Sequence, residues 1–514
     1  MKVFLIAVGG TGINCLQSYL YVNAISSNGF DEDVDYEVLF VDPDSTGSYT
    51  DLVESIAGYG ALKKAIDSEK EELKKKEENK RKNKKNTSEE NTDKSDKKKK
   101  NSEVKVKVEQ FCANFTINDK WTIATQLDRK LIELCETNNA ASDNATEEDL
   151  LQVFYQKKYL NMNFSGGFHG VPNVGTLVTK HFMDRDGSSW RDFLSKIKNE
   201  TQETHIVILG SIFGGTGAAG IPAVLNTVLE VKAYEKAKLH VLMMLPYFEL
   251  PNEEEVKKLG KGKVKYGLGN MNLNAAYALE YYESLDSNIL EKFSFIMVGQ
   301  PQKDLIKKED YTESGKEQKN KAMIAELVAS FLIIHSIKES RTLSETEDDR
   351  AKLIMSTFNT EDAENGFVDF DGIPYTDGFV KKIAAMKFLA EIFVNKLEEI
   401  FKRTESDRTT EETYVFEQRL KEIDENQVRY AANLFKNFIQ WSKNINFVNI
   451  KDKEKLLDIL YSYTTESEKE PVYKFKPNSE DTTEDIFEFY DFVDFITGYI
   501  RKHDLSGLEF LLLE

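Results

Sequence analysis

The feature of this sequence that most constrains its fold is a series of short, uninterrupted apolar runs. Strands that are buried on both faces of a parallel sheet have this continuous character, whereas half-buried strands alternate. Helical patterns lie between the runs, for example at Ile13, Leu16 and Leu20. The alternation predicts an α/β protein with a doubly wound parallel sheet. The runs are Val3–Val8, Tyr36–Val41, Ile206–Leu209, Leu239–Leu245 and Phe293–Val298.

Glycine-rich turns follow two of these runs and lead into helical patterns. After the third run the chain reads GSIFGGTGAAG, and an amphipathic pattern begins at Ile221. A loop that opens a helix directs unpaired N–H groups outward at the positive end of the helix dipole, and glycines let an anion approach. The pattern predicts phosphate binding, with a tight turn that holds no ligand as the alternative. The residues concerned are Gly9, Gly10, Thr11 and Gly12 after the first run and Gly214, Gly215, Thr216 and Gly217 after the third.

Neither of the two commonest glycine-loop motifs fits these turns. A Walker loop ends in Gly-Lys-Ser/Thr, and the turn after the third run has no lysine. A dinucleotide fingerprint, GxGxxG, would use Gly10 and Gly12 but meets Cys15 where its last glycine belongs. A nicotinamide-dependent Rossmann enzyme would have to use this first loop, and it stays open as an alternative.

Other polar and glycine-rich segments also follow the predicted strands, where open α/β sheets bind their ligands. The second run ends in VDPD, which places Asp42 and Asp44 at the carboxyl end of a strand. Carboxylate oxygens suit magnesium, so these two residues are the predicted metal ligands. The segment GGFHGVPNVG supplies Gly170, Pro172 and Asn173 before a predicted helix, and LPYFELP follows the fourth run.

Taken in order, these loops resemble those of the tubulin/FtsZ superfamily of GTP-binding filament proteins. The family signature is GGGTG followed by a small residue and glycine; residues 214–217 keep its core, and Pro222 lies where FtsZ-type sequences carry proline. Phe213 replaces the first glycine and Ala219 the later one, so the strict tubulin signature is not met. The similarity is greatest to the divergent bacterial tubulin-like proteins and covers roughly residues 1–340.

The resemblance implies a tubulin/FtsZ-like organisation. A nucleotide-binding domain spans residues 1–318, a central helix spans 319–338, and a C-terminal α+β domain with an acidic, aromatic tail spans 339–514. The residues themselves favour the central helix, because a helix that is apolar nearly all round is buried on several sides. Residues 69–102 have almost no apolar side chains to bury, and we predict a disordered insertion there.

Functional residues also carry over from the resemblance. It implies GTP or GDP with Mg²⁺ as the ligand, Asn14 as the asparagine of the first loop, Glu249 as the ribose acceptor and Asn320 as the asparagine that recognises guanine. Family members hydrolyse GTP between subunits that stack head to tail, with acids after the central helix. The candidates here are Glu361 and Glu364 in NTEDAE, further along the chain than in the family. A filament-forming GTPase is predicted; the alternative is a GTP-switched scaffold that does not hydrolyse, acting with an unidentified protein partner.

Composition argues against several other classes. The formal net charge of −20 disfavours nucleic acid as the main partner. No segment reaches about 18 consecutive apolar residues, so we expect no membrane span. The cysteines, Cys15, Cys112 and Cys135, have no metal-ligand spacing and suggest a reducing compartment. We therefore expect a cytoplasmic protein.

Overall fold

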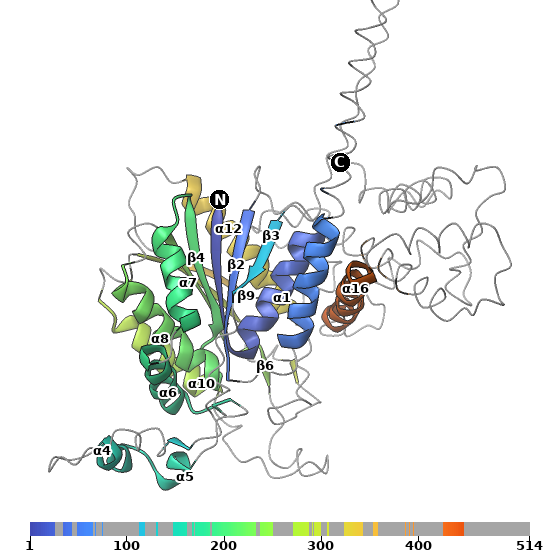
Figure 1. The fold of residues 1–514 in the computed structure, drawn as a ribbon. Coiled ribbons are helices and arrows are strands. Elements are labelled where there is room, and N and C mark those ends of the chain that lie inside the picture. Colours follow the sequence, from blue (N-terminus) through green and yellow to red (C-terminus); the bar gives the residue numbers. More distant parts are fainter. Residues whose placement is uncertain are drawn as a thin grey trace, which may run out of the picture.

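The computed structural model shows an α/β unit built on one parallel sheet (Figure 1). The predicted insertion at 69–102 lies outside the described residues, apart from position 75, and so does most of the predicted domain at 339–514. Among the described residues, no helix has the length and apolar character of a membrane span. The structure describes residues 1–25, 34–43, 49–64, 67, 75, 113–118, 130–131, 147–161, 167–168, 170–185, 188–232, 237–249, 271–286, 290, 292–299, 306–307, 323–342, 353–357, 386, 390, 394 and 425–446.

Within the described part of the chain the main sheet has seven strands, all parallel, in the order β3-β2-β1-β4-β5-β7-β9. The predicted α/β class is confirmed, and each predicted apolar run is confirmed as one of the strands β1, β2, β4, β5 and β7. The runs do not predict the edge strands β3 and β9; side chains of β3 alternate in burial, as expected at an edge. Strands β6 and β8 pair separately. The bounds are β1 Lys2–Val8, β2 Val34–Val41, β3 Ala113–Ile117, β4 Thr204–Ser211, β5 Ala237–Met244, β6 Phe248–Glu249, β7 Phe293–Gly299, β8 Ile306–Lys307 and β9 Leu353–Thr357.

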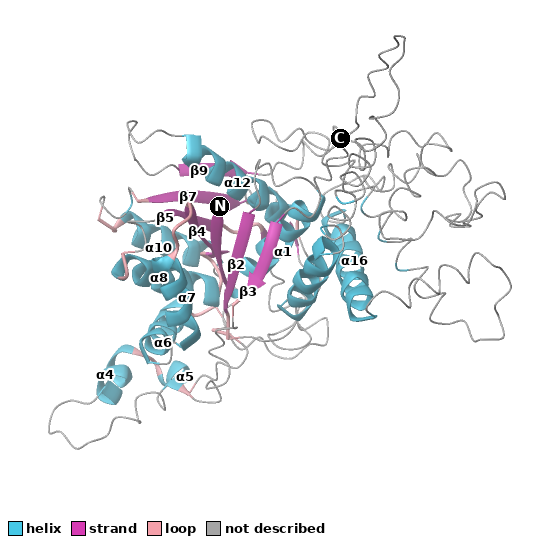
Figure 2. Cartoon of the chain, turned by 45° about the horizontal axis from the view of Figure 1, so that its top comes forward, coloured by secondary structure: helices cyan, strands magenta, loops and turns pink. Residues whose placement is uncertain are grey.

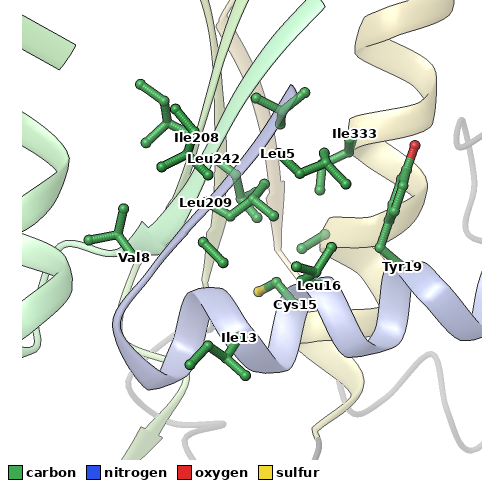
Figure 3. Close-up of a cluster of buried hydrophobic side chains, with 14 of the residues drawn as sticks. Leu5, Val8, Ile13, Cys15, Leu16, Tyr19, Ile208, Leu209, Leu242 and Ile333 are labelled. Atoms are coloured by element: carbon green, nitrogen blue, oxygen red, sulfur yellow. The ribbon is translucent and has the colours of Figure 1, made fainter. Parts of the chain in front are cut away.

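Helices cover both faces of the main sheet (Figure 2). Their bounds are α1 Gly9–Ile25, α4 Glu147–Phe154, α5 Lys157–Leu160, α6 Pro172–Arg185, α7 Ser188–Asn199, α8 Gly215–Glu230, α10 Met271–Glu283, α12 Ile324–Thr342 and α16 Glu425–Asn446. α1 and α12 lie on one face, and α6, α7, α8 and α10 lie on the other. Neighbouring side chains of β1 point to opposite faces of the sheet. Phe4 packs edge-on against Phe193 of α7, with 5.4 Å between ring centroids, whereas Leu5 lies with Leu16 of α1 and Ile333 of α12 (Figure 3).

α12, Ile324–Thr342, overlaps the central helix predicted at 319–338. Its side chains are buried from Ile324 to Ile334, and it packs against α1 and against β5 and β7. β9 follows it and pairs with β7, so that Leu353 lies opposite Phe295. The sequence places the start of a second domain at residue 339. In the structure, the chain beyond this point first returns to the main sheet.

α16, the last described helix, packs against α1 and against the helical residues 49–64. The indole N–H of Trp441 donates to Ser18 Oγ of α1 at 2.9 Å. The contact with 49–64 is so close that a Cβ on Gly58 would lie 2.3 Å from the carbonyl oxygen of Tyr430. α16 is therefore packed into the same folded unit as the first strand and the first helix.

Candidate functional site

The two predicted glycine loops meet where the strand order of the sheet reverses. From β1 the chain proceeds to β2 on one side, and from β4 it proceeds to β5 on the other. A Cβ built on Gly9 would lie 3.1 Å from the backbone nitrogen of Gly217 and 3.2 Å from Thr216 Cβ. Open α/β sheets bind ligands at such reversal points, outside the carboxyl ends of the strands. The structure therefore brings the two loops together at the edge where a ligand is expected.

The first loop is so short that α1 begins at its first glycine. Gly9 has a φ of +72°, in the left-handed region that favours glycine. Gly12 lies against β4, where a Cβ would come within 2.4 Å of the Leu209 carbonyl oxygen. Backbone conformation explains Gly9 and close packing explains Gly12, so these two glycines do not by themselves indicate a ligand. Gly10 and Thr11, between them, are partly exposed.

The second loop leaves the start of α8 suited to an anion. Gly214 is the N-cap residue, and it offers no side-chain hydrogen bond to the helix. The first turn of α8 carries no acid, and neither does the first turn of α1. N–H groups in a first helical turn lack partners within the helix and carry partial positive charge. Two such helix starts side by side, with the partly exposed Thr216 between them, have the chemistry of a phosphate site.

A turn that includes Gly167 and Gly170 lies over the start of α8. A Cβ on Gly215 would lie 2.7 Å from the Gly170 nitrogen, and a Cβ on Gly167 would lie 3.6 Å from Thr216 Oγ1. The sequence suggests that a side chain at position 215 would fill the space of a phosphate. In the structure, the first obstacle to such a side chain is the backbone of this turn.

α6 begins directly after this turn, at Pro172. Proline suits the first position of a helix, where its missing N–H is not needed. The Oδ1 atom of the next residue, Asn173, accepts a hydrogen bond from the Val174 N–H at 3.0 Å. Pro172 and Asn173, both predicted to bind the ligand, thus form the first turn of α6, beside Gly170.

Asn274 of α10 joins the two segments that surround the start of α8. Its Nδ2 donates to the carbonyl oxygen of Phe213 at 3.2 Å and to that of Gly170 at 3.4 Å. Phe213 directly precedes the N-cap glycine of α8. Asn274 therefore holds the second glycine loop and the turn above it at a fixed separation.

Asn14 is buried between α1 and α12. Only 4% of its surface is exposed, and its Nδ2 donates to Glu326 Oε1 at 3.2 Å. Its Oδ1 has no hydrogen-bond partner among the described residues. Burial raises the pKa of the neighbouring Cys15 thiol well above its ordinary value, with a further contribution from the Glu326 carboxylate. Asn14 is thus held by a protein carboxylate beneath the first glycine loop.

The predicted acidic ligands are placed only in part. Asp42 follows β2 at its carboxyl end and is 6% exposed. Glu249 is the second residue of β6, and its backbone lies opposite that of Lys307 in β8. Among the described residues, no group of three or more His, Cys, Asp or Glu side chains could hold a metal ion. Asp42 by itself supplies a single carboxylate. That is enough for magnesium only where phosphates bind the same ion. Asp44, Asn320, Glu361 and Glu364 lie outside the described residues.

Sequence reasoning did not single out Asn274, Tyr247 or Glu326, which the structure places around the loops. Glu326 carries a detectable signal, because it is the sole charged side chain between Met323 and Ile337 in an otherwise apolar helix. A lone acid in such a helix is buried with partners. Asn274 has no comparable signal, because its role depends on the distance between two loops from other parts of the chain.

Comparison with known proteins gives no relative that could assign this site. No protein-family model, no curated protein and no solved structure matches the chain.

Proposed function

We propose that this chain binds a guanine nucleotide, GTP or GDP, with the phosphates at the adjoining starts of α1 and α8. One observation carries the proposal: two helix N-termini, neither with an acid in its first turn, meet at the reversal point of a parallel sheet. Backbone N–H groups at such helix starts bind phosphate without a lysine. This agrees with the lack of a Walker lysine in either loop.

The predicted residues take distinct tasks in this proposal. The backbones of Gly10 and Gly215 contribute N–H donors, and the Thr216 hydroxyl donates to a phosphate oxygen. Asp42 shares a magnesium ion with the phosphates, and that ion, when bound, neutralises part of their charge. The guanine preference rests on the resemblance to the tubulin/FtsZ superfamily.

Assembly and hydrolysis form the second part of the proposal, and they also rest on that resemblance. The subunits stack head to tail, and GTP is hydrolysed between them by acids of the neighbouring subunit, Glu361 and Glu364. A head-to-tail contact does not close on itself, so it produces open filaments. A chain that binds GTP but neither assembles nor hydrolyses would instead be a nucleotide-switched scaffold.

Two observations favour a second candidate, a nicotinamide dinucleotide. Asp42 stands at the carboxyl end of β2, the position from which an acid contacts the ribose in Rossmann folds. Gly12 also provides the close packing of helix on strand that the third glycine of the fingerprint supplies. Against this candidate, Cys15 is fully buried where that third glycine belongs.

The test compares ligands directly. Purified protein is denatured, and any released ligand is identified by absorbance and mass; the refolded or ligand-free protein is then titrated with labelled GTP, GDP, ATP and NAD. Binding of GTP and GDP in preference to ATP supports the proposal. Preference for NAD favours the second candidate, equal affinity for GTP and ATP removes the guanine claim, and binding of none of them removes nucleotide binding altogether.

An isosteric pair of variants locates the phosphates. Thr216→Val removes the hydroxyl at the start of α8 and should weaken GTP binding about tenfold or more, the effect of one lost hydrogen bond to a charged group. Thr179→Val is the control, because Thr179 is buried in α6 and its hydroxyl has no hydrogen-bond partner among the described residues. Equal GTP affinity in both variants would show that the phosphates do not bind at the start of α8.

A further inference from the structure

Glu326, in the first turn of α12, is a fully buried carboxylate held by donors from separate parts of the chain. Its Oε1 accepts from Tyr247 Oη at 2.8 Å and from Asn14 Nδ2 at 3.2 Å. Its Oε2 accepts from the Met323 N–H at 2.9 Å. A buried carboxylate is strongly destabilising unless it is hydrogen-bonded, so each of these donors is needed.

Tyr247, from the segment that follows β5, contacts both glycine loops. Its hydroxyl donates to Glu326 and is also hydrogen-bonded to the side chain of Thr11 in the first loop. Its ring lies edge-on to that of Phe213, with 5.9 Å between centroids, just before Gly214 of the second loop. Tyr247 is 1% exposed. One buried tyrosine therefore connects α12 with both halves of the proposed phosphate site.

Asn14 is the second connection from Glu326 to the first loop. A carboxylate accepts hydrogen bonds only, so it fixes the Asn14 amide with Nδ2 toward α12. The opposite atom, Oδ1, has no hydrogen-bond partner among the described residues. Glu326 thereby sets the orientation of one side chain in α1 directly and of another, Thr11, through Tyr247.

We propose that Glu326 and Tyr247 are positioning residues of the nucleotide site, which hold the first glycine loop in its phosphate-binding geometry. This inference rests on the proposed function. It assigns a second task to a residue that also caps its own helix, since Glu326 Oε2 bonds the Met323 N–H. The two tasks use different oxygens, so they can be separated by experiment.

Tyr247→Phe makes that separation. It removes the hydroxyl between Thr11 and Glu326 but leaves the ring against Phe213 and the cap on Met323. The control is Tyr282→Phe, because Tyr282 is also buried and its hydroxyl has no hydrogen-bond partner among the described residues. Affinities for GTP, GDP and guanosine are measured by competition against a fluorescent GTP analogue, and thermal stability is measured alongside.

We expect Tyr247→Phe to weaken binding of GTP and GDP about tenfold, the lower end of the loss that follows when a residue that orients a binding group is removed. Binding of guanosine should be unchanged because guanosine has no phosphate. Tyr282→Phe should bind all three like the wild type. Glu326→Gln should follow Tyr247→Phe, because an amide cannot accept from every donor that the carboxylate serves. If Glu326→Gln fails to fold, the comparison of Tyr247→Phe with Tyr282→Phe still tests the inference.

Two results would overturn the inference. One is wild-type affinity for GTP in Tyr247→Phe; the other is an equal loss for guanosine and GTP, which a purely structural role would produce. Failure of the proposed function looks different, because the wild-type protein itself would then bind no guanine nucleotide. That outcome would remove this inference as well.

Discussion

His205 of β4 and His240 of β5 form a buried chain of hydrogen bonds. His205 Nδ1 lies 3.1 Å from His240 Nε2, and His240 Nδ1 lies 2.8 Å from Ser336 Oγ of α12. At the outer end, His205 Nε2 is 3.4 Å from Glu203 Oε1. One assignment satisfies every atom: both rings carry their proton on Nε2, and Ser336 donates to His240. The pair is therefore built for two neutral imidazoles.

Acid should destabilise the protein through this pair. Burial, followed by the charges of Lys238 and Arg341, lowers the pKa of His205 to about 3, and burial lowers that of His240 well below its ordinary value. Unfolded histidine titrates near 6.5, so between about pH 6.5 and 3 the unfolded chain binds more protons. Stability should fall by up to about 1.4 kcal/mol per pH unit for each histidine in this window, and the pair should contribute no pH dependence above it.

Urea unfolding at pH 7.5, 6 and 5 measures this slope. Replacing both histidines by Gln should flatten it, whatever the variant's stability at pH 7.5. His335→Gln is the control, because His335 is partly exposed and pairs with Glu339 on the same helix. An unchanged slope in the double variant would show that other groups govern acid sensitivity.

Two glycines should respond to alanine in opposite directions. Gly12→Ala places a Cβ 2.4 Å from the Leu209 carbonyl oxygen and forces α1 away from β4, which should cost about 1–3 kcal/mol. Gly60 lies in an exposed helical position with nothing within 4 Å of a Cβ. Gly60→Ala should therefore stabilise by about 0.5–1 kcal/mol. Chemical denaturation decides both, and a stable Gly12→Ala would contradict the close packing of α1 on β4.

Among the elements, α10 acts on the candidate site through one amide. Asn274→Ala removes the donor to Phe213 and Gly170, and we expect a loss of about 1 kcal/mol in stability and faster hydrogen exchange in residues 167–175 and 211–217. Asn272→Ala, at an exposed position of the same helix, is the control. Equal exchange in the two variants would show that α10 does not hold these segments.

The strands differ in how far their sequences reveal them. β1, β4 and β5 are buried on both faces, so continuous apolar runs mark them clearly. β3 lies at an edge and exposes alternate residues, and ANFTI gives no such run. Its place in the sheet follows from pairing with β2, a contact between residues far apart in the chain. Pairing of this kind leaves no local pattern.

The candidate site was predictable to a similar extent. Glycine loops before helices are local features, so the sequence predicts Gly9 and Gly214 to Gly217 at one edge of the sheet, and the structure places them there. Tyr247 and Asn274 belong to the site because of their contacts with other segments of the chain. Their partners, Thr11, Phe213 and Gly170, belong to other segments, and only the fold brings them within hydrogen-bonding or packing distance.

For the whole molecule, assembly should depend on both nucleotide and salt. If subunits stack head to tail over the nucleotide, GTP should promote filaments above a threshold protein concentration and GDP should not. The net charge of −20 opposes association, and salt near 0.1 M screens charges beyond about 10 Å, so very low salt should disfavour filaments. Pelleting and electron microscopy with GTP, GDP and no nucleotide, together with phosphate release, measure this.

Variants at the predicted catalytic acids complete the assembly experiment. Glu361→Ala with Glu364→Ala should leave GTP binding intact, slow phosphate release and lengthen filament lifetime. Filaments that form without any phosphate release in the wild type would remove the hydrolytic role of these acids. Protein that stays monomeric with GTP over a wide concentration range would favour the nucleotide-switched scaffold.

The central place of β1 in the sheet has a consequence for how the protein is made. β1 is synthesised well before its partner β4: Lys2 pairs with Thr204, and at ordinary rates of synthesis that partner follows roughly 10–40 s later. Trp441, which covers Ser18, emerges later still. The nascent chain must therefore keep a strongly apolar strand from other partners until β4 has been translated. A polypeptide released before residue 425 would leave the α1 surface that α16 covers open to chaperones and proteases.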